Sequence, residues 1–264
     1  MGSDDETNGV VRKALDPNAE EFAEASKGSG ESLGRSVKTL SRTVEALLTP
    51  LSVMVWAYDT IKEKFILDLE RKMEKVPEER RILPNVEIAG PAVEALRFTG
   101  QNDELRNLFA NVLATSMDAE TAANAHPSFV EIIKQLSSDE ALILRFMSRE
   151  ESIPMIDISS HEGGKNRYLR IAQNVSRLGE LAGCENKHLV QSAIDNLCRL
   201  ELCNSPHDKF IADEKMYEQV ENLPEVKDIV EQAEEGVEIE ISRRFLTLTV
   251  FGKQFIKACV EEKK

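Results

Sequence analysis

The most regular hydrophobic pattern in the chain lies between residues 33 and 65. Apolar side chains follow one another there at alternating spacings of four and three residues, the repeat of a helix that packs along its length against a partner. Pro50 interrupts this seam, and Thr49 can serve as the N-cap of a helix that begins at the proline. The pattern predicts one kinked helix or two helices, over about 31–48 and 50–75. The seam positions are Leu33, Val37, Leu40, Val44, Leu47, Leu51, Met54, Tyr58, Ile61 and Phe65.

Two interpretations of this seam stay open. It is typical of an ordinary bundle face, and the sharper alternative is a self-associating coiled coil. Residues 46–58 are also apolar on more than one face. That segment is too short to span a bilayer, so it is either buried core or able to lie in a membrane interface. The candidate oligomer or membrane face is Leu40, Leu47, Leu51, Met54, Val55, Trp56, Tyr58 and Phe65.

A proline-containing linker over 76–91 is predicted next, with Pro91 as the first residue of the following helix. Residues 100–103, "GQND", predict a break between two helices. After it, apolar side chains recur at helical spacing up to about Met117. These positions are Leu105, Leu108, Phe109, Val112 and Leu113.

A connection over 118–127 is predicted to lead into a helix that begins at Pro127. Phe129, Ile132, Ile133 and Leu136 would lie on one face of this helix. Ser137 or Ser138 would then cap "DEALILRFM", with two acids in the first turn, where the helix dipole favours negative charge.

The second half of the sequence contains both helical and strand-like patterns of apolar residues. The stretch "ESIPMIDISS" resembles a strand, and "NRYLRIAQNVSRLGELAGC" is interpreted as mixed helix and turn. Residues 184–206 predict one helix that ends in a strand. The inner face of that helix would be Leu189, Ala193, Leu197 and Leu200. "EIEIS" and "RFLTLTV" alternate like two hairpin strands, and "FGKQFIKACV" predicts a closing helix.

A helix, then a hairpin, then a closing helix is the order of a winged helix-turn-helix domain, which often reads DNA with the helix before the wing. Residues 136–264 carry 17 basic and 24 acidic residues, and 213–240 alone carry 11 acids against two lysines. Because a DNA-binding surface needs a basic footprint, contact with a protein is favoured over contact with DNA. The candidate partner or DNA face is Gln191, Ser192, Asp195, Arg199, Arg243 and Arg244.

The acidic insert 213–240 is interpreted as a solvated helical segment, since a charge run is usually an exposed face. The alternative is an arm that docks a partner. Residues 1–30 are polar and acidic and predict a flexible tail.

Serine, histidine and acidic residues gather at Ser116, Asp118, Glu120, His126 and Ser128. They fall at predicted helix ends and turns, and no nucleophile elbow or glycine-rich turn accompanies them. We therefore expect caps and a hydrogen-bonded hinge at His126, no enzymatic site and no cofactor. The cysteines Cys184, Cys198, Cys203 and Cys259 form no C-x-x-C pair, so isolated buried thiols are expected instead of a metal site.

The amino-acid composition narrows the possible fold and function classes of the protein. The 264 residues are 41% hydrophobic, 30% charged and 5% aromatic, with 13 glycines and nine prolines, which favours helices over an all-β fold. The formal net charge of −14 gives the chain no general attraction to nucleic acid. "MGSDDETNGVVRKAL" has no apolar signal-peptide region, so a cytoplasmic protein with reduced thiols is expected.

Several stretches occur in an order that resembles a known family. They are "LLTPLSVMVWAYDTIKEKF", "NVEIAGPAVEALRFT", "ELRNLFANVLATSMD" and "NAHPSFVEIIKQLSSDEALIL". Together they resemble the abortive-infection alpha family of bacterial proteins, which is linked to phage defence. The resemblance implies a host-sacrificing or growth-arresting response to phage and supplies no catalytic residues.

The sequence therefore predicts a mainly α protein. A helical bundle or hairpin over 31–135 would precede a winged-helix-like α+β domain over 136–264. We expect a non-enzymatic antiphage protein that acts through protein contacts and helical self-assembly, with a phage-derived or protein trigger. Membrane perturbation at the inner membrane is an extension of this hypothesis, and a DNA-binding regulator is the alternative.

Overall fold

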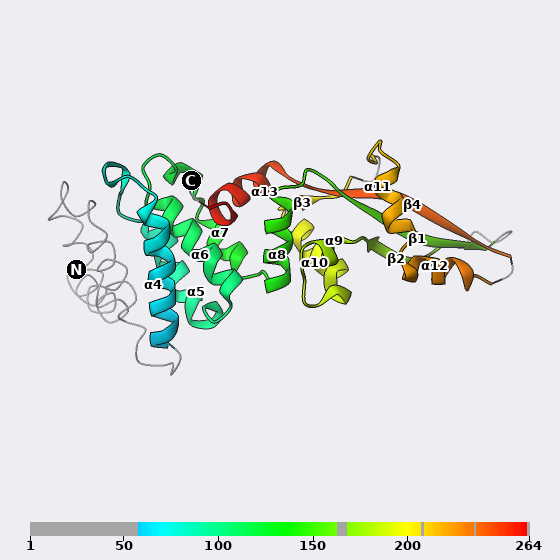
Figure 1. Ribbon diagram of the computed structural model, residues 1–264, viewed down its shortest axis with the longest axis horizontal. Helices are drawn as coiled ribbons and strands as arrows, with labels where there is room; N and C mark the ends of the chain where they lie inside the picture. Colours follow the sequence, from blue (N-terminus) through cyan, green and yellow to red (C-terminus); the bar gives the residue numbers. More distant parts are fainter. Residues whose placement is uncertain (1–57, 163–167, 207–208, 235, 263–264) are drawn as a thin grey trace, which may run out of the picture.

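The computed structural model describes residues 58–162, 168–206, 209–234 and 236–262. These residues form an elongated molecule, with a helical body at one end and a sheet with two helices at the other (Figure 1). The fold is mainly α, with one four-stranded antiparallel sheet. The residues predicted as a tail and most of the heptad seam, up to residue 57, lie outside the described part of the chain.

The body begins with α4 (Tyr58–Glu74), which packs on α6 (Asp103–Ser116) beside α5 (Val86–Thr99). Phe65, a seam position, is fully buried within this same chain. A short 3₁₀ turn, η2 (Glu78–Arg80), lies in the linker between α4 and α5. The predicted start of α5 at Pro91 is wrong, because the Asn85 side chain caps the helix six residues earlier and Pro91 lies inside it.

Helix α6 is the centre of the body, and the predicted break before it is confirmed. The Asn102 side chain accepts hydrogen bonds from the amides of Glu104 and Leu105, at 3.1 Å each, and so fixes the first turn. From Leu105 onward almost every residue of α6 is buried, because α4, α5, α7 and the C-terminal helix surround it. The predicted stripe is confirmed, with Leu105, Leu108, Phe109, Val112 and Leu113 all in the core.

The next elements follow the sequence pattern closely. After the 3₁₀ turn η3 (Ala122–Asn124) come α7 (Ser128–Ile133) and α8 (Ser138–Met147). The predicted inner face of α7 is buried. Ser137 caps α8 in a capping box: its side chain accepts a hydrogen bond from the Glu140 amide, and the Glu140 side chain accepts one from the Ser137 amide.

The sheet has the strand order β2-β1-β4-β3. Strand β1 (Ile153–Glu162) pairs with β4 (Val237–Leu248) in unbroken register, from Ile153 opposite Leu246 to Glu162 opposite Val237. Strand β2 (Tyr168–Val175) pairs with the other side of β1 through two register shifts, and β3 (Cys203–Asn204) pairs only with the end of β4.

Two predictions about these strands are wrong. Residues 168–175 form a strand, where mixed helix and turn was expected. "EIEIS" and "RFLTL" form one continuous strand, because the Ser242–Arg244 stretch that suggested a turn stays paired with β1.

Between β2 and β3 lie α9 (Leu178–Leu181), the 3₁₀ turn η4 (Lys187–Leu189) and α10 (Val190–Arg199). Ala193, Leu197 and Leu200 are buried as predicted. Leu189 instead precedes the helix and is 51% exposed.

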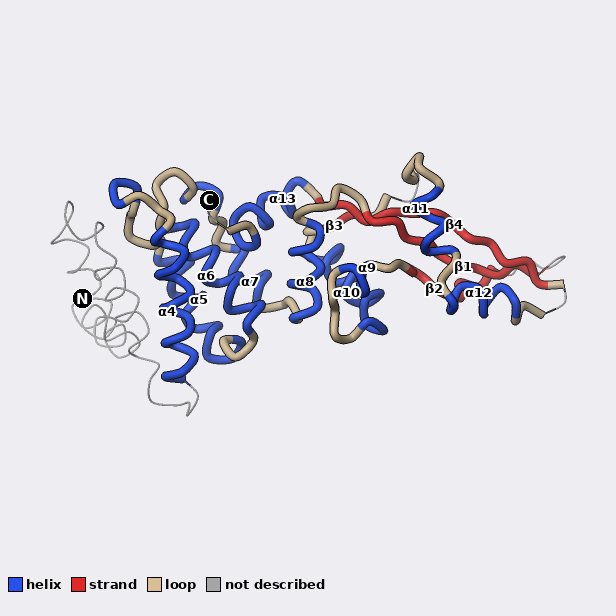
Figure 2. Tube along the Cα trace, in the orientation of Figure 1, coloured by secondary structure: helices blue, strands red, loops and turns tan. Residues whose placement is uncertain are grey.

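Helices α11 (Lys215–Glu221) and α12 (Pro224–Glu231) form most of the acidic insert. The insert is helical, but it is not merely solvated. Tyr217, Val220 and Val226 are buried in a second core cluster against Ile156 and Ile158 of β1. We call β1, β2 and β4 together with α11 and α12 the arm; Figure 2 shows its strands running side by side away from the body.

The C-terminus returns to the body. Helix α13 (Val250–Phe255) continues into a π-helical turn, η5 (Ile256–Val260), which packs on α6. The Asn111 side chain donates to the carbonyl of Cys259 at 2.8 Å, and Thr115 Oγ1 donates to the carbonyl of Ala258 at 3.0 Å. One hydrophobic cluster therefore runs from α4 to η5, across the boundary predicted at residue 135.

Candidate functional site

The exposed face of α10 is the candidate site. Val190, Ala193, Ile194 and Leu197 are buried, so the helix has one inner face and presents the opposite face to solvent. Four of the predicted partner-face residues lie together on that outer face: Gln191, Ser192, Asp195 and Arg199, all exposed.

The start of α10 is held by an acid on another helix. Asp139 of α8 accepts hydrogen bonds from the backbone amides of Glu185 and Asn186, at 2.8 and 2.9 Å, and from the Asn186 side chain at 3.2 Å. Burial of Asp139 acts to raise its pKa, but the hydrogen bonds from Asn186 and Glu185 outweigh it, so the net pKa is lowered. A carboxylate of α8 therefore fixes the loop that leads into α10.

The far end of α10 is joined to the same neighbour. The Asn196 side chain donates to Glu140 Oε1 at 2.7 Å and to the carbonyl of Gln135 at 3.2 Å. Arg199 donates to Asn196 Oδ1 and, at 3.1 Å, to Gln135 Oε1. Since Glu140 also closes the capping box of α8, both ends of α10 rest on one preorganised frame.

The third support comes from the root of the sheet. Asn174, at the end of β2 with a positive φ of 57°, donates from its side chain to Asp195 at 2.9 Å. Its backbone amide donates to Asp157 Oδ1 at 2.8 Å. Asn tolerates this left-handed conformation better than most residues, so the turn sets a polar link between the sheet and the α10 face.

The two arginines predicted for this face lie elsewhere. Arg244 is 6% exposed; it donates to Asp157 Oδ2 at 2.7 Å and to Ser205 Oγ at 2.8 Å. Arg243 projects from the other face of β4, where it forms a bidentate ion pair with Glu221 and lies over the ring of Tyr217. Arg244 therefore holds the arm to its root, and Arg243 holds α11 to the sheet.

Electrostatically, the α10 face is mixed. Lys187, Arg199, Glu185, Asp195 and Glu201 are all exposed on α10 or beside it in the chain. Opposite charges alternate there without an excess of basic side chains, which suits a polar protein surface better than a phosphate backbone.

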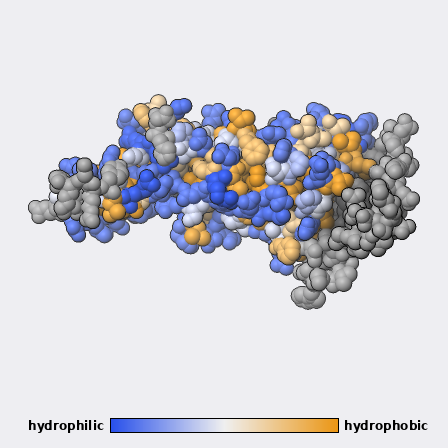
Figure 3. Space-filling view, turned by 180° about the vertical axis from the view of Figure 1, so that it is seen from behind, coloured by the Kyte–Doolittle hydropathy of each residue, from blue (hydrophilic) through white to orange (hydrophobic). Residues whose placement is uncertain are grey.

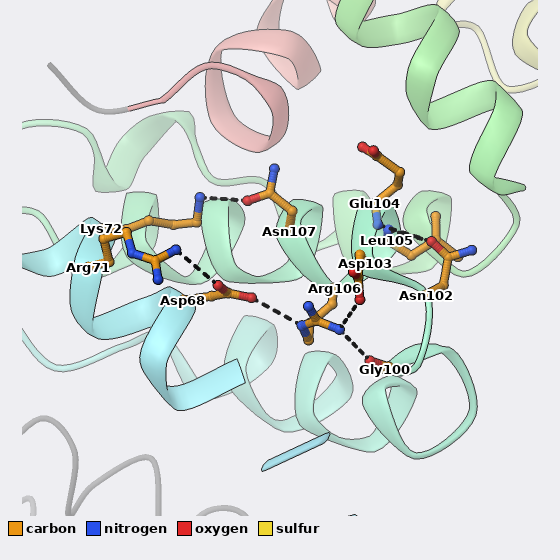
Figure 4. A network of polar contacts seen from close by, with 10 residues as sticks. All are labelled: Asp68, Arg71, Lys72, Gly100, Asn102, Asp103, Glu104, Leu105, Arg106 and Asn107. Atoms are coloured by element: carbon orange, nitrogen blue, oxygen red, sulfur yellow. Dashed lines mark hydrogen bonds and ion pairs between the residues drawn. The ribbon is translucent and has the colours of Figure 1, made fainter. Parts of the chain in front are cut away.

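A second polar network joins α4 to the start of α6 (Figure 4). Arg106, 7% exposed, donates to Asp68 at 3.0 Å, to Asp103 at 2.7 Å and to the carbonyl of Gly100 at 3.0 Å. Lys72 donates to Asn107 Oδ1 at 2.7 Å, and burial lowers its pKa despite the nearby acids Glu262 and Asp68. Every strong donor in this network has a partner, so it serves to clamp α4 onto α6.

The serine, histidine and acid cluster is dispersed in the fold. Ser116 Oγ donates to the carbonyl of Leu113 in its own helix at 2.7 Å. Asp118 accepts two hydrogen bonds from Arg80, at 2.9 and 2.6 Å. His126 Nδ1 lies 2.7 Å from Ser128 Oγ and accepts from the Ser128 amide, which confirms a hydrogen-bonded residue at a helix junction.

The cysteines are free thiols. Cys184, Cys203 and Cys259 are buried and Cys198 is half-buried. Burial raises the pKa of all four, and that of Cys184 reaches about 11. Within the described ranges, no group of three or more His, Cys, Asp or Glu side chains could hold a metal ion.

Of the predicted oligomer or membrane face, only its last two positions fall within the described ranges. Tyr58 is the first residue of α4, and Phe65 belongs to the core of the chain itself. Leu40, Leu47, Leu51, Met54, Val55 and Trp56 lie outside the described residues. No helix of the described part is long and apolar enough to cross a membrane.

A family model described as abortive infection alpha matches residues 58–259, which covers the body, the α10 face and the arm. No curated protein matches the sequence. One solved structure, an uncharacterized protein from the hydrocarbon-degrading marine bacterium Alcanivorax borkumensis SK2, is 17% identical with a TM-score of 0.34, over 50% of this chain and 92% of that chain. At that level, the likeness indicates neither fold nor function.

Proposed function

The chain belongs to the abortive infection alpha family, and we propose that it serves abortive antiphage defence without catalysis, by docking a protein partner on the exposed face of α10. The observation that carries the proposal is the frame behind this face. Asp139 and Glu140 come from α8 and Asn174 comes from β2, and each of the three fixes a different part of α10 or of the loop before it. A surface held in this way is preorganised, which lowers the entropy that a partner must pay on binding.

The order of elements supports a winged-helix-like interpretation of this region. Helices α8, α9 and α10 precede the short strand β3, and the long strand β4 follows and pairs with β1. In such a domain α10 is the recognition helix and the antiparallel ribbon is the wing. Here the ribbon is extended into the arm, and the charged side chains of its insert α11–α12 are mostly acidic.

Protein is the proposed partner class, ahead of DNA. Asp195 and Glu185 lie within or beside the α10 face, and the basic Arg244 of the predicted wing is buried against Asp157. A duplex would meet acidic side chains at the α10 face and would gain no contact from the buried Arg244. The partner chemistry that fits is a polar surface with mixed charge, either a host protein or a phage-derived trigger.

In this proposal, docking on α10 leads to a response of the N-terminal seam, through self-assembly or through exposure of residues 46–58 to membrane. Leu40→Lys together with Leu47→Lys tests assembly, since charges in an apolar seam oppose helix pairing. Val53→Asp tests the membrane step through liposome leakage. A chain that neither assembles nor perturbs liposomes under any triggering condition would contradict this second stage while leaving the docking step intact.

The docking step is tested with bacteria that express Arg199→Glu or Gln191→Arg and are challenged with phage. We expect wild-type cells to be protected and both variants to lose protection at equal protein level. Lys227→Glu is the matched control for Arg199→Glu, because it makes the same charge change at an exposed position of α12, away from α10. Full protection by both α10 variants would overturn the assignment of this face.

A DNA duplex-binding assay at low salt distinguishes docking of a protein partner from the alternative function, a DNA-binding regulator. If the chain bound DNA with steep salt dependence and Arg199→Glu abolished it, the regulator would replace the docking proposal. The expected result is no binding by either protein.

A further inference from the structure

Among the described strands, neither long edge of the arm's sheet is fully paired. Strand β2 is the last strand on one side, and no described strand pairs with its outer edge. On the other side, β3 covers β4 only at Thr247 and Leu248. The distal part of β4, from Val237 to Ile241, therefore presents its outer edge as well. Open edges expose unpaired backbone donors and acceptors, which are templates for pairing with another chain.

The two edges differ in the side chains that they carry. On β2, Leu169 is 67% exposed and Ile171 is 41% exposed, with the exposed Arg170 between them. Natural edges are usually blunted by charge or by short strands, so large apolar side chains on an open edge indicate a partner. On β4, Glu238 and Glu240 are exposed and alternate with Ile239 and Ile241.

The strand register shows that the apolar side chains of β2 and distal β4 lie on one face of the sheet and their charged side chains on the other. Leu169 lies opposite Ser160 and Ser160 opposite Ile239, so Leu169 and Ile239 project from the same face, the one covered by α11 and α12. Arg170 lies opposite Ser159 and Ser159 opposite Glu240, so Arg170 and the two glutamates project from the other face. If a second copy extended the sheet, apolar side chains would meet on one face and opposite charges on the other.

We propose that the outer edge of β2 in one copy of this chain pairs with the outer edge of distal β4 in a second copy, so that successive arms form one continuous sheet. Because two different edges meet, the contact is head-to-tail and repeats into a ring or a filament. Charge complementarity favours a second copy as the occupant: two copies that each carry a net charge of −14 repel one another generally, and this contact joins a cation to acids.

The position of the arm suits such a contact. Figures 1 and 2 show the ribbon projecting from the body, so that distal β4 and the start of β2 lie away from the helices of the body. Seen from behind, the arm at the left of Figure 3 is mainly hydrophilic with a few hydrophobic side chains. The two register shifts leave Tyr168–Arg170 as the regular part of the β2 edge, which sets a short contact on that side.

This inference deepens the self-assembly of the proposed function and assigns it a surface that does not use the N-terminal seam. The test therefore starts from the full chain carrying Leu40→Lys and Leu47→Lys, in which the seam is disabled. Sedimentation velocity over a range of protein concentrations at low salt reports the assembly of this parent and of Arg170→Glu and Glu238→Arg made within it. We expect the parent to assemble with increasing concentration and each single variant to stay monomeric where the parent assembles.

An equimolar mixture of the two variants gives the decisive comparison. In the mixture, the reversed β2 edge of one variant faces the reversed β4 edge of the other, so opposite charges meet again and assembly returns. Arg71→Glu is the matched control for Arg170→Glu, because Arg71 is exposed on α4 and its substitution makes the same charge change far from the arm. It should assemble like the parent. All three positions are exposed, so each variant is expected to fold like the parent. Circular dichroism and thermal unfolding check that it does.

Three results would overturn the inference. The parent could remain monomeric at every concentration while wild type assembles, which would place assembly in the seam and leave the proposed function standing. Either single variant could assemble like the parent. The mixture could remain monomeric. As an independent readout, amide hydrogen exchange of residues 237–241 should slow on assembly of the parent, and unchanged exchange would count equally against edge pairing.

Discussion

Arg244 of β4 and Asp157 of β1 form an ion pair at 2.7 Å at the root of the arm, and both side chains are nearly removed from solvent. Asp157 also accepts the backbone amide of Asn174, which in turn binds Asp195 on α10. This pair therefore connects the sheet to the candidate partner face, and it lies where the chain passes from the body into the arm.

Removing one partner of this pair leaves a buried charge without compensation. Arg244→Met should lower the free energy of unfolding by about 3 kcal/mol, because an unpaired buried carboxylate is costly. Urea unfolding of purified protein measures the change. Lys134→Met is the control, since Lys134 pairs with Glu131 on the surface and its loss should be barely measurable. Equal stability of Arg244→Met and wild type would contradict the structural role of the pair.

Asp139 should make the stability of the α10 frame depend on acid. Its folded pKa lies below the ordinary value, so its contribution is fully present above about pH 4 and is lost as pH falls through the folded pKa. Asp139→Ala should cost about 2 kcal/mol at neutral pH through the lost charge-assisted hydrogen bonds. The gap between variant and wild type should narrow as the solution is acidified. A gap independent of pH would show that the carboxylate charge does not matter.

Two glycines should respond to alanine in opposite directions. A Cβ at Gly252, in the first turn of α13, would overlap the carbonyl oxygen of Leu202, so Gly252→Ala should destabilise by about 3 kcal/mol. A Cβ at Gly90 in α5 would meet nothing within 4 Å, so Gly90→Ala should stabilise by about 0.5 to 1 kcal/mol through helix propensity. The denaturant midpoint of Gly252→Ala should lie below that of wild type, and the midpoint of Gly90→Ala should lie above it. Two midpoints that both lie above or both lie below wild type would contradict this packing.

The hydroxyl of Thr115 should hold the C-terminal turn on α6. Thr115→Val keeps the shape of the side chain but leaves the buried Ala258 carbonyl without this donor, a loss of about 1 to 2 kcal/mol. Hydrogen exchange of the amides of η5 should accelerate in the variant. Thr99→Val provides the comparison, because Thr99 donates to a carbonyl of its own helix. If both variants exchanged alike in η5, the hydroxyl would not be what docks the C-terminus.

Local signals account for most of the helices that were predicted correctly. The breaks at Asn102 and Ser137 were visible because capping depends on a few adjacent residues, and the apolar stripe of α6 repeats at helical spacing. The exposed residues of α10 were predicted for the same reason, since one face of that helix is strongly apolar.

What the sequence did not predict depends on contacts between distant residues. Two hairpin strands were predicted over "EIEIS" and "RFLTLTV", yet the chain between them stays extended, with Arg243 and Arg244 paired to Glu221 and Asp157. The burial of Tyr217, Val220 and Val226 in an acidic segment required the sheet that covers them. Strand β2 was missed because bulges break its alternation, although the Asn at position 174 is a residue type that tolerates a left-handed turn.

The frame behind α10 was also missed. Asp139 was predicted only as an acid in the first turn of a helix, and its reach to Glu185 and Asn186 spans more than forty positions of the chain. No local pattern encodes such a pairing. The supporting residues are recognisable only in the fold, where α8 lies beside the loop that precedes α10.

The central claim, abortive defence without catalysis, is tested most directly by phage challenge of bacteria that express wild-type protein, at low and at high multiplicity of infection. We expect that the culture survives at low multiplicity and collapses at high multiplicity, because infected cells stop growing before phage spread. Cultures with and without the protein that behave alike at both multiplicities, across a broad phage panel, would contradict it.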